Sequence, residues 1–128
     1  MAPGRVRGSV TESGGWYPYR PVHSQTESTY AEIFSALSEP VRIEIVGMIA
    51  ATDELACTVL DDTLPISKST ISYHIKILYH AGLISVRKEG RYYFYKLRRE
   101  VFDQYVDGFL ERLATARRSR KKELAAAR

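Results

Sequence analysis

The stretch SKSTISYHIKIL, residues 67–78, joins a helical apolar stripe to a second face of short hydrogen-bonding side chains. Its apolar residues Ile71, Ile75 and Leu78 recur at the spacing of one helix face, which predicts a helix capped by Ser67 with that face buried. Reading DNA base edges requires small donors and acceptors near the N-terminal end of an inserted helix. The other face supplies such groups at Lys68, Ser69, Thr70, Ser72 and Tyr73, and Lys76 further along the helix is expected to contact phosphate. This pattern indicates either a nucleic-acid contact or a solvated helix face.

The segments on either side of this helix favour the nucleic-acid interpretation. Before it, DELACTVLDDTL at 53–64 predicts a shorter helix, and the turn LPIS separates the two as in a helix-turn-helix. After it, LISVRK and RYYFYKL are rich in β-forming residues and flank Glu89-Gly90, which predicts a β-hairpin. The basic residues that bracket the hairpin tip are Arg87, Lys88 and Arg91. A basic hairpin beside a helix-turn-helix is a wing, whose tip can follow phosphates or enter a minor groove.

The charge of the chain changes sign where this helix begins. Residues 29–66 hold seven acidic side chains and one basic side chain, a net charge of −6. Residues 67–99 hold eight basic side chains and one acidic side chain, a net charge of +7. A switch of this size at one boundary indicates that one side of the fold meets a polyanion.

The remaining apolar patterns predict helices before and after this unit. Order is expected from Thr29, and Ser38 is expected to cap a second helix that has Pro40 in its first turn. The first two helices carry apolar positions at Tyr30, Ile33, Phe34, Leu37, Val41, Ile45, Met48 and Ile49. A last helix is expected from Glu100. Its apolar stripe comprises Val101, Phe102, Tyr105, Val106, Phe109, Leu110 and Leu113. This stripe is wider than one small core requires, which indicates a dimer interface.

Length and composition favour one ordinary globular domain with tails, because the 128 residues are 45% apolar and 27% charged. Three segments are expected: a flexible N-terminal arm at 1–28, a winged helix-turn-helix DNA-binding and dimerisation domain at 29–115, and a basic C-terminal tail at 116–128. No apolar run suits a membrane span or a secretory signal, so the expected location is the cytoplasm. The single cysteine, Cys57, excludes a disulfide within the chain.

The segments LSEPVRIEIV, STISYHIKILYHAGLI and RKEGRYYFYKL resemble the ArsR/SmtB family of bacterial winged-helix repressors, over about residues 29–113. The expected fold class is therefore mainly α: a homodimeric winged helix-turn-helix of four helices, a β-hairpin and a final helix. The resemblance implies repression by operator binding, with double-stranded DNA and a second copy of the chain as partners. The recognition positions that it implies are Ser69, Thr70, Ser72 and Tyr73. The dimerisation residues expected on the first and last helices are Ile33, Phe34, Phe102, Val106, Phe109 and Leu113.

The metal sites of that family are not matched in this chain. Members that sense thiophilic metals carry a Cys-x-Cys pair in the third helix, where this chain has Ala56 and Thr58 with Cys57 between them. Zinc-sensing members use Asp and His pairs on the last helix, and here Asp103 has no matching histidine. We therefore expect no metal and no cofactor.

The other candidate groups receive structural interpretations. His74 is expected to support its helix or to contact phosphate, and neither His80 nor His23 is expected to be a metal ligand. The adjacent Asp61 and Asp62 read as a solvated pair. No glycine-rich phosphate loop and no nucleophile–base arrangement stands out, so the protein is not expected to be an enzyme.

The leading prediction is a sequence-specific DNA-binding transcriptional regulator that acts as a repressor on an inverted-repeat operator. Two alternatives remain open. A winged helix can serve as a protein-interaction module without DNA binding. A regulator can also sense an effector, and Cys57 or the histidines would then act in an arrangement foreign to the family. A small-molecule or protein effector is therefore a further possible partner.

Overall fold

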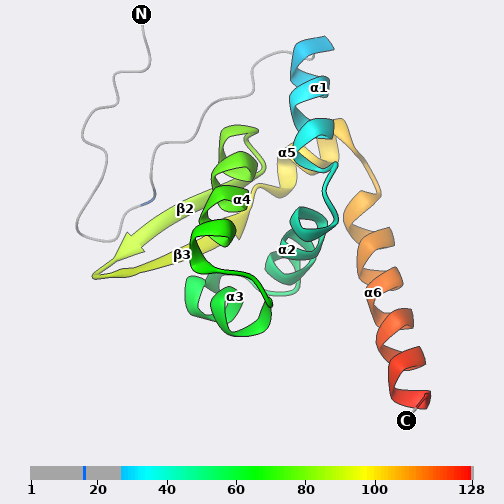
Figure 1. The fold of residues 1–128 in the computed structure, drawn as a ribbon. Helices are drawn as coiled ribbons and strands as arrows, with labels where there is room; N and C mark the ends of the chain where they lie inside the picture. The colour runs from blue at the N-terminus through cyan, green and yellow to red at the C-terminus, as the bar shows by residue number, and fades with distance from the viewer. Residues whose placement is uncertain (1–15, 17–26, 128) are drawn as a thin grey trace, which may run out of the picture.

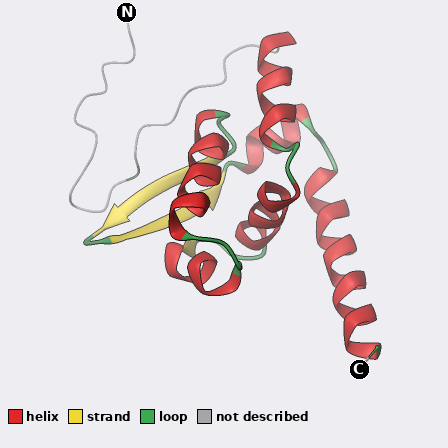
Figure 2. Ribbon diagram, viewed as in Figure 1, coloured by secondary structure: helices red, strands yellow, loops and turns green. Residues whose placement is uncertain are grey.

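The computed structural model describes Trp16 and residues 27–127, and within them helices pack at one end of a small sheet whose hairpin projects to the side (Figure 1, Figure 2). The elements in chain order are α1 (Glu27–Ala36), α2 (Pro40–Ala50), β1 (Leu55–Ala56), α3 (Cys57–Thr63), α4 (Lys68–His80), β2 (Ile84–Glu89), β3 (Tyr92–Leu97), α5 (Arg99–Tyr105) and α6 (Phe109–Ala126). This mainly helical architecture with a projecting hairpin is the winged helix-turn-helix that the sequence predicts.

Helix α4 has the two faces expected from its sequence. Ile71, Ile75 and Leu78 are buried on one side. The helix begins after Ser67, whose Oγ accepts the backbone N–H of Thr70 at 3.2 Å, so the predicted cap is confirmed. The short helix α3 precedes α4 across a turn, and the two form the helix-turn-helix (Figure 1).

The sheet contains a strand that the sequence pattern did not predict. Its order is β1-β3-β2, with both neighbours antiparallel to β3. The prediction of one helix over 53–64 was wrong at its start, because Leu55 pairs with Tyr95 in extended backbone and α3 begins only at Cys57. The two-residue strand β1 thereby ties the base of the hairpin to the helices.

The predicted hairpin is confirmed, with its turn one residue later than expected. Glu89 pairs with Tyr92, so the loop consists of Gly90 and Arg91 rather than Glu89-Gly90. Gly90 has φ 64°, a left-handed conformation that suits glycine in a two-residue hairpin loop. This turn places Arg91 at the tip of the wing.

Helix α2 is not capped as its sequence predicted. Its N-cap residue is Glu39, which makes no side-chain capping hydrogen bond, and Pro40 occupies the first turn. The Oγ of Ser38 instead donates to the carbonyl oxygen of Ser35 at 2.6 Å, at the end of α1. Proline at the helix start lowers the need for a cap, because one orphan N–H is absent there.

The expected single C-terminal helix is two helices, which corrects that prediction. Gly108 adopts a left-handed conformation with φ 83°, and this breaks the helical path between α5 and α6 although the apolar spacing continues across it. Helix α6 then runs without interruption across the expected 115/116 boundary and has no fully buried residue. It packs against α2, where a Cβ added to Gly47 would lie only 2.6 Å from Cδ of Arg117.

One apolar core takes buried side chains from every element except α6, whose half-buried Phe109, Leu110 and Leu113 pack against it. Its largest fully buried side chains are Phe102, Ile33, Ile45, Ile49, Leu60, Leu78, Leu83, Ile84 and Val46. They come from α1 through α5, so the helix-turn-helix and the base of the wing share one packed interior.

Replacing Ser67 by alanine should lower the free energy of unfolding by about 1 kcal/mol, because α4 loses the oxygen that accepts the Thr70 N–H. Urea unfolding followed by circular dichroism measures this change. Ser72→Ala on the exposed side of α4 is the matched control. It should not lower the free energy of unfolding, because alanine favours a helix more than serine does. Equal losses in the two variants would show that the cap does not stabilise the helix.

Candidate nucleic-acid interface

The outer face of α4 is a continuous polar surface. The residues predicted there, all exposed, are Lys68, Ser69, Thr70, Ser72, Tyr73 and Lys76. The aromatic side chain of Tyr73 is 59% exposed although tyrosine is a large residue. The buried stripe on the opposite side holds the helix against the core, so this face is presented outward.

Three hydroxyl groups gather at the N-terminal end of α4. The Oγ of Ser67 lies 3.1 Å from the Oγ of Ser69 and 2.9 Å from Oγ1 of Thr70. These hydrogen bonds fix the orientation of two of the predicted base-reading side chains before any ligand arrives. The N-terminal end of a helix also carries the positive end of the helix dipole, which favours an anion such as phosphate.

A buried arginine that the sequence analysis missed supports α4 from behind. The Nη1 of Arg42 lies 3.0 Å from Nδ1 of His74, and both residues are buried. Arg42 also donates through Nε to the carbonyl oxygen of Ala36 at 2.7 Å and through Nη2 to that of Ser35 at 3.4 Å. The sequence spacing could have indicated that Arg42 is buried. It lies three residues before Ile45 and four before Val46, which places it on the buried side of α2.

His74 therefore holds a supporting position inside the fold. Burial lowers the pKa of His74 below its usual 6.5, the positive charge of Arg42 lowers it further, and Glu39 opposes the shift. Because a guanidinium can only donate, Nδ1 of His74 accepts and the ring proton lies on Nε2.

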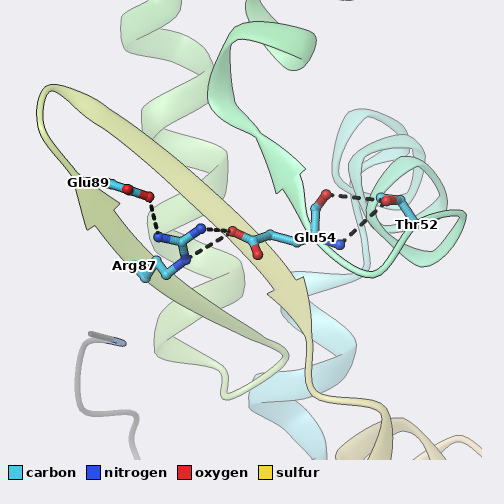
Figure 3. A network of polar contacts seen from close by, with 4 residues as sticks. All are labelled: Thr52, Glu54, Arg87 and Glu89. Atoms are coloured by element: carbon cyan, nitrogen blue, oxygen red, sulfur yellow. Dashed lines mark hydrogen bonds and ion pairs between the residues drawn. The ribbon is translucent and has the colours of Figure 1, made fainter. Parts of the chain in front are cut away.

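The predicted wing residue Arg87 is held by carboxylates of its own chain (Figure 3). Its Nε and Nη2 donate to Oε2 of Glu54, the first at 2.9 Å, and its Nη1 donates to Oε1 of Glu89 at 2.7 Å. These hydrogen bonds raise the pKa of Arg87, and the bond to Glu89 has the larger effect. Thr52 in turn binds the backbone of Glu54 through its Oγ1. The guanidinium thus joins β2 to the loop before β1.

The other two predicted basic residues of the wing differ in how exposed their side chains are. Lys88 is half-buried, with Nζ 5.6 Å from the ring centroid of Tyr93. Arg91 is exposed in the turn between β2 and β3. Arg91 is therefore the basic side chain that the wing extends furthest from the core.

The predicted dimerisation residues divide into two groups. Ile33 and Phe102 are buried within the chain's own core, so their side chains have no surface to offer a partner and the prediction is corrected for these two. Phe34 is 54% exposed, and the half-buried members of the set are Val106, Phe109 and Leu113. Phe109 also stacks on Phe102 with ring centroids 6.0 Å apart, which links the start of α6 to the core.

The remaining polar candidates do not converge. Within Trp16 and residues 27–127, no three His, Cys, Asp or Glu side chains lie close enough together to hold a metal ion. The half-buried Cys57 accepts the backbone N–H of Tyr93 through Sγ at 3.4 Å. His80 lies at the exposed end of α4 against the ring of Tyr79. His23 and nearly all of the expected arm lie outside the described residues.

Among the helices of the described part, none combines the length and the apolar character of a membrane span.

The fold and the exposed face of α4 define a winged helix-turn-helix protein. A family described as "Helix-turn-helix domain" matches residues 37–87, which cover α2 through α4 and most of β2. A solved ArsR-like transcriptional regulator from Rhodococcus sp. RHA1 superimposes with a TM-score of 0.56 at 27% identity, over 78% of this chain and 90% of that one.

Similar sequences from two bacteria identify the family to which the chain belongs. The HTH-type transcriptional regulator YceK of Bacillus subtilis is 35% identical over 77% of this chain and 99% of its own length. An arsenical resistance operon repressor of Staphylococcus xylosus is 32% identical over 66% of this chain and 79% of that protein. The chain belongs to the ArsR/SmtB family of DNA-binding helix-turn-helix transcriptional regulators, as its sequence resemblance predicted.

The stability of the protein should fall as the pH drops below about 6.5, because the unfolded chain then takes up a proton on His74 that the folded chain resists. At higher pH both states are neutral at this site and the effect is absent. Urea unfolding at about pH 7.5 and about pH 5.5 measures the loss. His74→Gln keeps an acceptor for Arg42 and should show a smaller loss on acidification. An equal loss in the variant would place the acid sensitivity elsewhere.

Proposed function

We propose that the protein is a homodimeric repressor that binds an inverted-repeat operator, with α4 in the major groove and the wing on the flanking backbone. The observation that carries the proposal is the exposed polar face of α4, which stands beside a hairpin with Arg91 at its tip. Membership of a family of transcriptional regulators supports the repressor role. Such a protein acts where the DNA is, in the cytoplasm.

Within this interface the side chains take different roles. Ser69, Thr70 and Tyr73 are assigned to reading bases, because they stand near the N-terminal end of α4 with their polar groups outward. Ser72 stays a recognition position, as the family resemblance implies, and the residues assigned to phosphate contact are Lys68, Lys76, Lys88 and Arg91. Arg87 is reassigned to holding the wing in place, since its guanidinium already binds two carboxylates.

The proposed dimer uses the apolar surface that the protomer leaves uncovered. Phe34 on α1 and Leu113 on α6 are partly exposed members of that surface. Two-fold symmetry then requires two half-sites with centres one helical turn apart, roughly 34–36 Å, or a multiple of that distance.

Selection of bound sequences from random DNA separates this proposal from its alternatives. Recovery of an inverted repeat supports the operator-binding dimer. Failure to select any sequence would favour a winged helix that binds a protein partner instead. Repeating the binding assay with zinc, nickel, copper and an oxidant would test sensing through Cys57 or the histidines, for which the structure shows no metal cluster among its described residues.

Arg91→Ala and Tyr73→Ala should affect DNA binding in different ways. Removing the Arg91 phosphate contact should lower the slope of log K against log salt by about one unit and leave the sequence preference unchanged. Removing Tyr73 should relax the preference at one position of the half-site with little change in slope. Titrations on the selected operator and on single-base variants measure both effects. Unchanged binding in both variants would contradict the assignment.

Phe34→Ser should weaken the dimer, because it removes an apolar side chain from the uncovered surface of α1 while leaving the protomer core intact. Sedimentation equilibrium over a range of concentrations measures the dissociation constant. Val59→Ser on α3, where the side chain is 40% exposed, is the matched control and should not change it. A monomeric wild-type protein, or equal weakening in the control, would refute this interface.

A further inference from the structure

Trp16 lies against the wing although it is far from the wing in the sequence. Its backbone forms an antiparallel bridge with Arg87 of β2. Strand β2 is at the edge of the sheet, with β3 on its other side, so Trp16 occupies the edge of β2 that the sheet leaves open. Residues paired in this way share a face of the sheet, and Arg87 is also paired with Phe94. Trp16, Arg87 and Phe94 therefore form one row across the wing.

The side chains of this row are in contact through their rings and charges. Cζ of Arg87 lies 5.6 Å from the ring centroid of Trp16 and 4.5 Å from that of Phe94. Nζ of Lys96 lies 5.1 Å from the ring centroid of Trp16. Cations within about 6 Å of an aromatic ring are attracted to its face. Two cations of the wing thus hold one indole.

On this row the base of the wing has two other attachments, the ion pair of Arg87 with Glu54 and the pairing of β3 with β1. Strand β1 contributes only two residues, and Ala56 pairs with Phe94 on the side of β3 away from β2. The hairpin of β2 and β3 projects away from the helices (Figure 1). An isolated two-stranded hairpin is marginally stable in water, so a contact that extends the row also limits movement of the tip.

We propose that Trp16 is a positioning residue for DNA binding: it braces the edge of β2 beside Arg87 and so holds the wing where Arg91 reaches phosphate. The inference rests on the proposed function of the wing. It makes Trp16, which lies far outside the helix-turn-helix, part of the DNA-binding unit.

Trp16→Ala should lower operator affinity roughly fivefold and reduce the slope of log K against log salt by about one unit, because Arg91 is then no longer held at phosphate. Circular dichroism and the midpoint of unfolding should stay close to those of the wild type, since Trp16 is not part of the apolar core. Trp16→Phe retains a ring for the two cations and should restore most of the affinity. The double variant with Arg91→Ala should lose little more than Arg91→Ala alone.

A second measurement needs no DNA. Trp16 is the only tryptophan of the chain, so fluorescence excited at wavelengths that the nine tyrosines do not absorb reports on it alone. Quenching by acrylamide should be weaker in the native protein than in the urea-unfolded chain, and Lys96→Met should increase it by removing one of the two cations. Native quenching as strong as that of the unfolded chain would overturn the docking.

The outcomes distinguish this inference from the function on which it rests. If Arg91→Ala leaves the salt slope unchanged, the proposed role of the wing fails. If Arg91→Ala lowers the slope but Trp16→Ala binds like the wild type, only the positioning role of Trp16 is overturned. Tighter operator binding by Trp16→Ala would also overturn it, because the docked indole would then obstruct DNA instead of placing the wing.

Discussion

The buried guanidinium of Arg42 joins the three helices on which the DNA-contacting face depends. A charge inside a protein is costly unless it is hydrogen-bonded, and here each of the three guanidinium nitrogens has a partner among the carbonyl oxygens of Ser35 and Ala36 and the ring of His74. Those carbonyls belong to the last turn of α1, whose final oxygens have no N–H donor within the helix. The planar fork of one arginine therefore caps α1 from α2 and sets where α4 can lie.

Arginine and lysine do different work in this chain. Arg87 binds two carboxylates, Arg98 donates to the carbonyl oxygen of Gly82 at the end of α4, and Arg99 donates to that of Ala50 at the end of α2. The exposed lysines of the same region are Lys68, Lys76 and Lys96. A charge count of residues 67–99 thus overstates the positive charge that faces DNA, because several of its guanidinium groups are engaged inside the protomer.

The features that the sequence predicted are those set by neighbours along the chain. The two faces of α4, its cap at Ser67 and the hairpin around Gly90 follow from spacing and turn chemistry within a few residues. Strand β1 could not be predicted in this way, because two residues become a strand only when β3 arrives beside them. The carboxylate partners of Arg87 depend likewise on contacts between distant segments, as does the loss of Ile33 and Phe102 from the expected dimer surface. Apolar spacing alone does not say whether a core or a partner covers a residue.

The left-handed Gly108 separates two helices that contribute differently to the core: α5 has buried side chains and α6 has none. Helix α5 places Val101, Phe102 and Tyr105 in the core, so it can open only when the core opens. Helix α6 contributes no fully buried side chain, and its local opening costs mainly its own backbone hydrogen bonds, its partial packing on α2 and the stacking of Phe109 on Phe102. The protomer therefore has two levels of stability on either side of residue 108. A surface that covered α6 would raise the free energy of opening that helix. The buried core that holds α4 would stay unchanged.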